Sequence, residues 1–150
     1  MPMTAAQVLA AVPQQDPFRF IDEILELDDE HIVSRYRFRP ESDFYRGHFP
    51  GNPVTPGVIL IEAMAQAGIV ALGIFLISGE EGGFDPEKMM TLFTDAAVDF
   101  SGMVKPGDEV TVECRKVFWR RRKLRAEASM TLEDGTVVCS GTVSGMGVSR

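Results

Sequence analysis

The segment from Val58 to Ile77 constrains the fold more than any other, because it contains only two strongly polar side chains, Glu62 and Gln66. These two are four residues apart, so a helix places them on one face. A helix that is apolar nearly all round needs cover on every side, which a wrapped sheet and a partner subunit would supply. The segment is also long enough, at about 20 residues, to span a bilayer. Its two polar residues and the absence of flanking Lys or Arg argue against a membrane span, and we expect a buried core helix.

A rigid loop precedes this helix, with the sequence GHFPGNPVTPG at residues 47–57. Its three prolines and three glycines hold the backbone in shapes that neither a helix nor a strand accepts. Thr55 is a good N-cap, and Pro56 suits the first helical position because its missing N–H has no intrahelical partner. Gly57 then offers the first free backbone N–H, at the positive end of the helix dipole. The sequence therefore predicts an oxyanion site at Gly57.

The string GHFPGNPVTPGVILIEAMAQA, residues 47–67, resembles the signature of the bacterial 3-hydroxyacyl-[acyl-carrier-protein] dehydratases of the FabZ type. By this resemblance His48 matches the catalytic histidine and Glu62 the catalytic carboxylate, at the same fourteen-residue spacing. Gly57 matches the glycine whose N–H polarises the substrate thioester. The similarity continues through residues 104–108 and, more loosely, through residues 137–139.

The resemblance implies a single hot-dog domain over residues 1–150, and the length of the chain agrees with one domain. This α+β fold is an antiparallel sheet of about six strands wrapped around a long central helix. The implied activity is that of a hydro-lyase, which dehydrates 3-hydroxyacyl-carrier-protein thioesters to trans-2-enoyl thioesters in fatty-acid or related acyl-chain biosynthesis. No metal and no organic cofactor are implied. In hot-dog dehydratases the histidine and the carboxylate of one site come from different subunits, so an obligate homodimer is implied, often assembled further into a trimer of dimers.

Dehydration requires a base for the C2 proton, an acid for the C3 hydroxyl and a site for a developing oxyanion. Neutral histidine is a common general base near pH 7, which suits His48 to the first role. Glu62 suits the second role if burial among apolar neighbours raises its pKa and keeps it protonated. The Gly57 N–H would stabilise the enolate-like oxygen.

Three further residues near the motif are candidates for the site. Gln66, one turn after Glu62, could orient that carboxylate, and equally it could satisfy a backbone group. Tyr45 and Phe49 flank the motif and are candidates to line an acyl tunnel, although core packing explains them as well. Thr55 stands where the family commonly has Met, which leaves chain-length preference and pathway open.

The net charge of −7 is unevenly distributed along the chain. Residues 115–125 hold seven of the 15 Lys and Arg and no acid, which leaves eight cations against 22 acids elsewhere. This acidic remainder would repel phosphates, so nucleic acid is a poor partner. A solvated turn or a docking surface for an acidic carrier protein explains the densest part of the basic run. That part is predicted at a hairpin tip and comprises Arg120, Arg121, Arg122 and Lys123.

Periodic patterns assign the rest of the chain. We predict a short helix over residues 4–12 and strands over residues 18–27, 32–39, 88–100, 110–118, 124–132 and 136–148. Cys114 and Cys139 fall at inward positions of these strands, so we expect two reduced, buried thiols. Nothing at the N-terminus resembles a secretory signal, and we expect a cytoplasmic protein.

Two other functions remain open. A thioesterase on the same fold would need a water molecule positioned by Glu62 to attack the thioester carbonyl. A non-catalytic acyl-thioester-binding protein of a specialised lipid or polyketide pathway would bind the ligand without turnover. Glu rather than Asp at position 62 favours the FabZ type over the related FabA type, which also isomerises the double bond.

Overall fold

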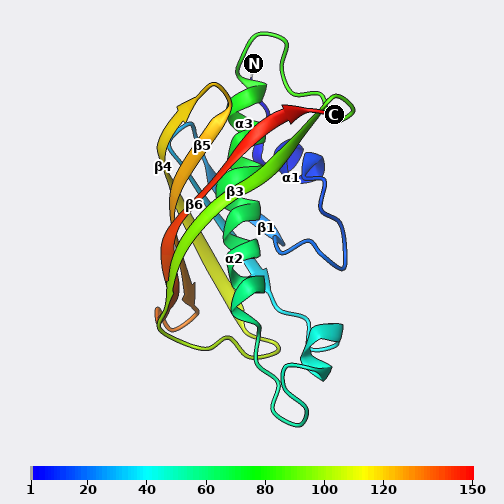
Figure 1. Cartoon of the computed structure of the whole chain (residues 1–150), viewed down its shortest axis with the longest axis vertical. Helices are drawn as coiled ribbons and strands as arrows, with labels where there is room; N and C mark the ends of the chain where they lie inside the picture. The colour runs from blue at the N-terminus through cyan, green and yellow to red at the C-terminus, as the bar shows by residue number, and fades with distance from the viewer. Residues whose placement is uncertain (1) are drawn as a thin grey trace.

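A six-stranded antiparallel sheet wraps around one long helix (Figure 1). The computed structural model describes residues 2–150. Along the sheet the strand order is β1-β2-β4-β5-β6-β3. The predicted α+β arrangement is therefore confirmed. The strands are β1 (Glu23–Leu27), β2 (His31–Arg37), β3 (Met89–Phe100), β4 (Glu109–Arg120), β5 (Lys123–Leu132) and β6 (Val137–Ser149).

The central helix runs for 22 residues from Gly57 to Ser78, close to the predicted bounds. It comprises α2 (Gly57–Ala65), a π-helical segment (Gln66–Ala71) and α3 (Leu72–Ser78). Length and composition alone would allow this helix to cross a membrane, but 72% of its most apolar window is buried inside the protein. It is thus the core helix that the sequence predicted. The π-helical segment was not predicted, and all six of its residues are buried.

The helix approaches the sheet closely at Gly68. A Cβ atom at this position would lie 2.8 Å from Cys114 Sγ and 3.6 Å from the Cβ of Ala126. A side chain larger than hydrogen would therefore push the helix away from β4 and β5. Cys114 and Cys139 are both free and buried, as predicted, and burial raises their pKa values to about 12 and about 11.

The N-terminal segment matches the predictions in part. Helix α1 (Ala5–Ala11) begins after Thr4, and the Thr4 and Gln7 side chains form a capping box. The strand predicted over residues 18–27 is shorter, because β1 begins only at Glu23. The reason is that the backbone groups of Phe18 and Phe20 form hydrogen bonds with a helix side chain, described below, rather than with another strand.

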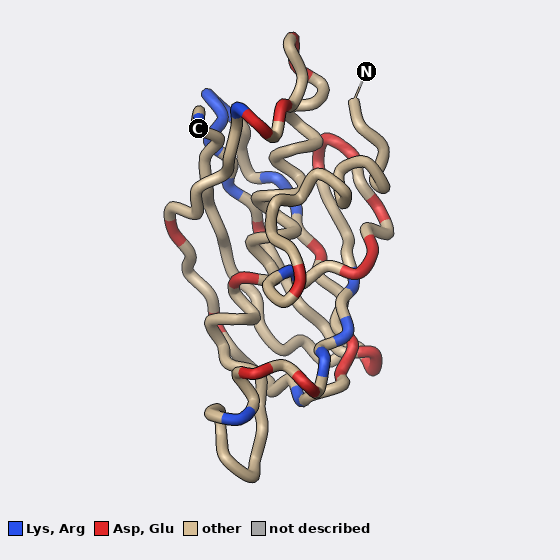
Figure 2. The backbone as a smooth tube through the Cα atoms, turned by 90° about the vertical axis from the view of Figure 1, so that its right-hand side faces the viewer, with Lys and Arg blue, Asp and Glu red and all other residues tan. Residues whose placement is uncertain are grey.

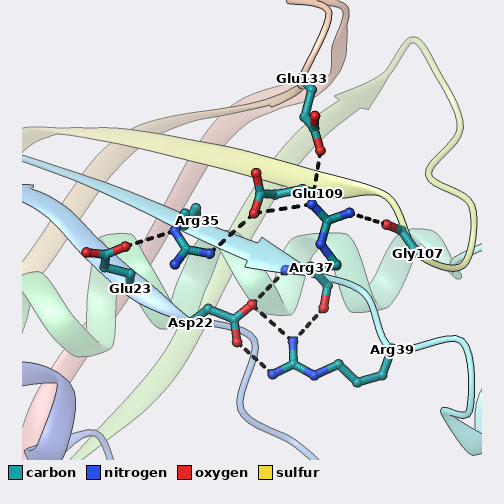
Figure 3. Close-up of polar contacts among 8 residues, drawn as sticks. All are labelled: Asp22, Glu23, Arg35, Arg37, Arg39, Gly107, Glu109 and Glu133. Atoms are coloured by element: carbon teal, nitrogen blue, oxygen red, sulfur yellow. Dashed lines mark hydrogen bonds and ion pairs between the residues drawn. The ribbon is translucent and has the colours of Figure 1, made fainter.

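Arginines on β2 and just beyond it tie β1, β2 and β4 together (Figure 3). Burial would raise the pKa of Asp22, but hydrogen bonds from the Arg39 guanidinium and the Arg37 N–H outweigh it and lower that pKa. Because each of these three guanidinium groups faces a carboxylate, their charges are neutralised within the protomer. The ion pairs are Arg35–Glu23, Arg35–Glu109, Arg37–Glu109, Arg37–Glu133 and Arg39–Asp22, at nitrogen–oxygen distances of 2.9, 3.3, 3.7, 3.2 and 2.7 Å.

Candidate functional site

His48 lies on the loop between a short 3₁₀ helix (Asp43–Arg46) and α2. Its Nδ1 atom is 2.9 Å from the backbone oxygen of Val54. A carbonyl oxygen only accepts hydrogen bonds, so Nδ1 carries the hydrogen and a neutral ring leaves Nε2 bare. The Phe49 ring stacks on the His48 ring with 4.0 Å between centroids, and Phe49 is 51% exposed. The loop thus presents one basic nitrogen beside an exposed aromatic ring.

The segment between this loop and the helix is held by Thr55. Its N–H donates to Val104 O at 2.8 Å, and its hydroxyl lies 2.6 Å from the Tyr45 hydroxyl. The prediction that Thr55 caps the helix is wrong, because this hydroxyl is engaged by Tyr45 and makes no capping hydrogen bond. Pro56 occupies the N-cap position instead, and the helix begins at Gly57. Tyr45 is itself buried, which favours a packing role for its ring.

Gly57 presents its N–H at the first position of the central helix. Among residues 2–150 this N–H has no hydrogen-bond acceptor, as expected for the first turn of a helix. A Cβ atom at Gly57 would lie 3.1 Å from the ring of Phe100 on β3, so glycine lets this ring pack closely against the start of the helix. The sequence did not single out Phe100 or Val104, although Val104 opens the second stretch of family resemblance.

Glu62, which is half-buried, and the buried Gln66 form a hydrogen-bonded pair on the central helix. Gln66 is fully buried, and its Nε2 donates to Glu62 Oε2 and to Phe18 O, both at 2.8 Å. Its Oε1 accepts the N–H of Phe20 at 2.8 Å, which fixes the orientation of the amide. Both contacts considered for Gln66, with the carboxylate and with the backbone, are therefore present. Burial raises the pKa of Glu62, and the hydrogen bond from Gln66 lowers it in part.

His48 and Glu62 belong to different surroundings in one chain. The hydrogen bond of the His48 ring stays within its own loop, whereas Glu62 bonds with Gln66 beside the segment at Phe18. No hydrogen bond joins the two side chains within residues 2–150. In the same part of the chain, no group of three or more His, Cys, Asp or Glu could hold a metal ion.

The basic tip, residues Arg120 to Lys123, forms the turn between β4 and β5, as predicted. Arg121 and Arg122 have φ angles of 50° and 61°, in the left-handed region that favours glycine. The tip lies near the C-terminal end of the central helix, where Arg122 Nε is 4.0 Å from Glu80 Oε1. The helix is about 30 Å long at 1.5 Å per residue. The tip and the His48 loop are therefore at opposite ends of the protomer (Figures 1 and 2).

Most of this chain is similar in sequence to known proteins. Residues 12–142 match a family model described as FabA-like domain. A 3-hydroxyacyl-[acyl-carrier-protein] dehydratase FabZ from Herpetosiphon aurantiacus is 36% identical over 143 residues, which cover 93% of this chain and 94% of the relative. A FabZ from Oenococcus oeni is 35% identical, over 92% of this chain and 94% of the relative.

Solved structures share the fold of this chain. The dehydratase heterocomplex ApeI:P from Xenorhabdus doucetiae is similar with a TM-score of 0.74, covering 97% of this chain and 90% of that chain at 15% identity. An identity this low shows a shared fold and nothing further.

The raised pKa of Glu62 predicts how stability depends on pH. A carboxyl whose folded-state pKa exceeds its ordinary value of 4.5 contributes fully below pH 4.5 and loses that contribution as the pH rises through the folded-state value. The substitution Glu62→Gln removes this ionisation. We expect the variant to gain stability over the wild type from pH 4 to pH 8, as measured by urea midpoints. Glu127→Gln, at an exposed position, is the matched control, and a pH-independent difference for Glu62→Gln would contradict the prediction.

Proposed function

The chain belongs to the FabA-like family, and from that membership we propose that His48 and Glu62 are the base and the acid of its reaction. The enzyme is a hot-dog dehydratase that converts 3-hydroxyacyl-[acyl-carrier-protein] thioesters to enoyl thioesters in fatty-acid biosynthesis. The observation that carries the assignment of roles is the hydrogen bond from His48 Nδ1 to Val54 O, which leaves Nε2 bare as a base. We propose that the enzyme acts in the cytoplasm.

The proposed reaction begins when His48 Nε2 takes the C2 proton. The electron pair of that C–H bond moves toward the thioester carbonyl, whose oxygen meets the free N–H of Gly57. The pair then forms the C2–C3 double bond as the C3–O bond breaks. Glu62 gives its proton to the leaving hydroxyl, which departs as water. A net transfer of one proton from His48 to Glu62 restores the starting state.

The hydrogen bond from Gln66 determines which oxygen of Glu62 carries the acid proton. Its Nε2–H points at Oε2, so Oε2 must accept and the acid hydrogen belongs on Oε1. The amide cannot be turned round without breaking the hydrogen bond from the Phe20 N–H to its own oxygen. Gln66 is thus proposed as a positioning residue that fixes both the direction and the protonation of the acid.

We propose that two subunits share each site, as in the hot-dog dehydratases that the sequence resembles. Two observations support this proposal: no hydrogen bond joins His48 to Glu62 in the described chain, and large apolar side chains lie exposed on the His48 loop, at the start of the central helix and on β3. Val58 is 72% exposed, Phe49 51% and Phe100 48%. A second copy would cover these side chains and bring its own Glu62 toward His48. The proposed unit is a homodimer, which a trimer of dimers would extend.

We propose that the basic tip binds the acidic carrier protein. Arg120, Arg121 and Lys123 face no carboxylate within 4.0 Å among residues 2–150, in contrast to the arginines of Figure 3. Unpaired cations on an otherwise acidic protein attract and orient an acidic partner. Because the tip is far from His48 of its own protomer, the carrier would bind one subunit and deliver its acyl chain to a site completed by the other.

Replacement of either proposed catalytic residue should abolish dehydration. We expect His48→Ala and Glu62→Gln each to lower turnover of a 3-hydroxyacyl-carrier-protein by about 10²-fold or more, because general acid–base catalysis contributes this much. Mass spectrometry detects the loss of one water from the substrate, and melting temperatures control for folding. Hydrolysis of the thioester would favour a thioesterase instead. Binding with unchanged substrate would favour a non-catalytic binding protein.

Shared sites predict complementation between two inactive variants. When His48→Ala and Glu62→Gln subunits are co-expressed in equal amounts, random pairing joins an intact His48 with an intact Glu62 in about one quarter of the sites. We therefore expect about a quarter of wild-type turnover from the mixture, against near zero for each variant alone. A mixture as inactive as its components would show that both residues of a site come from one chain.

Charge reversal at the basic tip should weaken carrier binding without affecting the chemistry. For Arg120→Glu/Lys123→Glu we expect KM for the carrier-bound substrate to rise about tenfold at low salt, with kcat unchanged. The same acyl group on pantetheine alone should be turned over as by the wild type. Arg115→Glu, in the same basic run but outside the tip, is the control. An equal loss with both substrates would contradict carrier docking at the tip.

A further inference from the structure

The hydroxyl groups of Tyr45 and Thr55 share a buried hydrogen bond that has no place in the reaction described above. Their oxygens are 2.6 Å apart, and each residue is only 5% exposed. Neither hydroxyl has another hydrogen-bond partner within residues 2–150. The Tyr45 ring also packs against Phe44, with 4.6 Å between centroids. A buried hydroxyl without a partner is costly, so each of the two requires the other.

This pair acts on the peptide unit between Val54 and Thr55. The Val54 carbonyl and the Thr55 N–H belong to one planar unit and point in opposite directions. The carbonyl accepts from His48 Nδ1 at 2.9 Å, and the N–H donates to Val104 O at 2.8 Å. The Thr55 side chain, on the α-carbon that ends this unit, is held by Tyr45. A rotation of the plane that moves the carbonyl away from His48 breaks the contact of the N–H with Val104 O, and a displacement of the α-carbon that ends the plane disturbs the contact with Tyr45.

We propose that Tyr45 and Thr55 are a positioning pair for His48, which keeps the Val54 carbonyl aimed at Nδ1. This inference rests on the proposed role of His48 as the base. A neutral imidazole is a base at Nε2 only while its hydrogen is on Nδ1, and the acceptor at Nδ1 selects that tautomer. Without the pair, only the Thr55 N–H contact with Val104 O holds the plane, so the carbonyl turns away more readily and the ring populates the tautomer with hydrogen on Nε2. The enzyme then still binds its substrate, but a smaller fraction of its His48 rings can act as a base.

The kinetic test compares single and double variants. We expect Tyr45→Phe and Thr55→Val each to lower kcat about tenfold with KM unchanged, and each to lower the melting temperature. The double variant removes both hydroxyls, leaves no buried donor without a partner and should regain stability, yet keep the low kcat. Thr55→Ser retains the hydroxyl and should retain kcat. Recovery of kcat together with stability in the double variant would overturn the proposal, because the pair would then serve stability alone.

A spectroscopic readout separates positioning from stability. The chain contains only two histidines, His48 and His31, so imidazole nitrogen NMR shifts are simple to assign. In the wild type His48 should show the tautomer with hydrogen on Nδ1, and the double variant should show a mixture. His31 contacts Asp28 and Glu26 away from the loop and serves as an internal reference. An unchanged His48 tautomer with reduced kcat would overturn the proposal, whereas an active His48→Ala enzyme would overturn the role of His48 itself.

Discussion

The central helix is apolar nearly all round, and the need to cover it determines most of the structure. The sheet wraps around it, and small residues let the two approach: Gly68 makes room for Cys114 Sγ, and a Cβ atom at Gly145 on β6 would collide with Ile69 of the helix. Close packing of this kind leaves no space for water around the buried part of the helix. Any polar side chain that the helix carries there must consequently find its partner within the protein.

Gln66 shows how one polar side chain meets this requirement and serves the site as well. Its amide satisfies backbone groups of Phe18 and Phe20 and still has one N–H for Glu62. This hydrogen bond limits the rise that burial causes in the pKa of Glu62, because a donor on Oε2 favours the charged form. A site that both gives and regains a proton benefits from these opposing effects, since an acid with too high a pKa would not release its proton. One side chain thus satisfies the polar groups beside the buried helix and adjusts the pKa of the proposed acid, Glu62.

The sequence predicted what local chemistry determines. The loop at residues 47–57, the long helix, the strands and the tip at Arg120 follow from proline, glycine and hydrophobic periodicity, and the structure agrees. The errors arise where a distant partner competes with a local preference. Thr55 is a good cap by type, but Tyr45 takes its hydroxyl, and Phe18 to Asp22 reads as a strand, but Gln66 takes part of its backbone hydrogen bonding. No periodicity reveals a side chain that reaches from a helix to a segment 46 residues away.

The sheet covers the central helix incompletely at its N-terminal end, where the proposed site lies. At Gly57 the nearest side chain of the sheet is Phe100 on the edge strand β3, and the adjacent Val58 is mostly exposed. If the sheet covered this end of the helix completely, it would block the free N–H that the proposed oxyanion site requires. Incomplete cover leaves apolar surface in water. The proposed second subunit would resolve this conflict, because it would cover the apolar rim. The constraint that wraps the sheet around one helix therefore also favours a site that two chains complete.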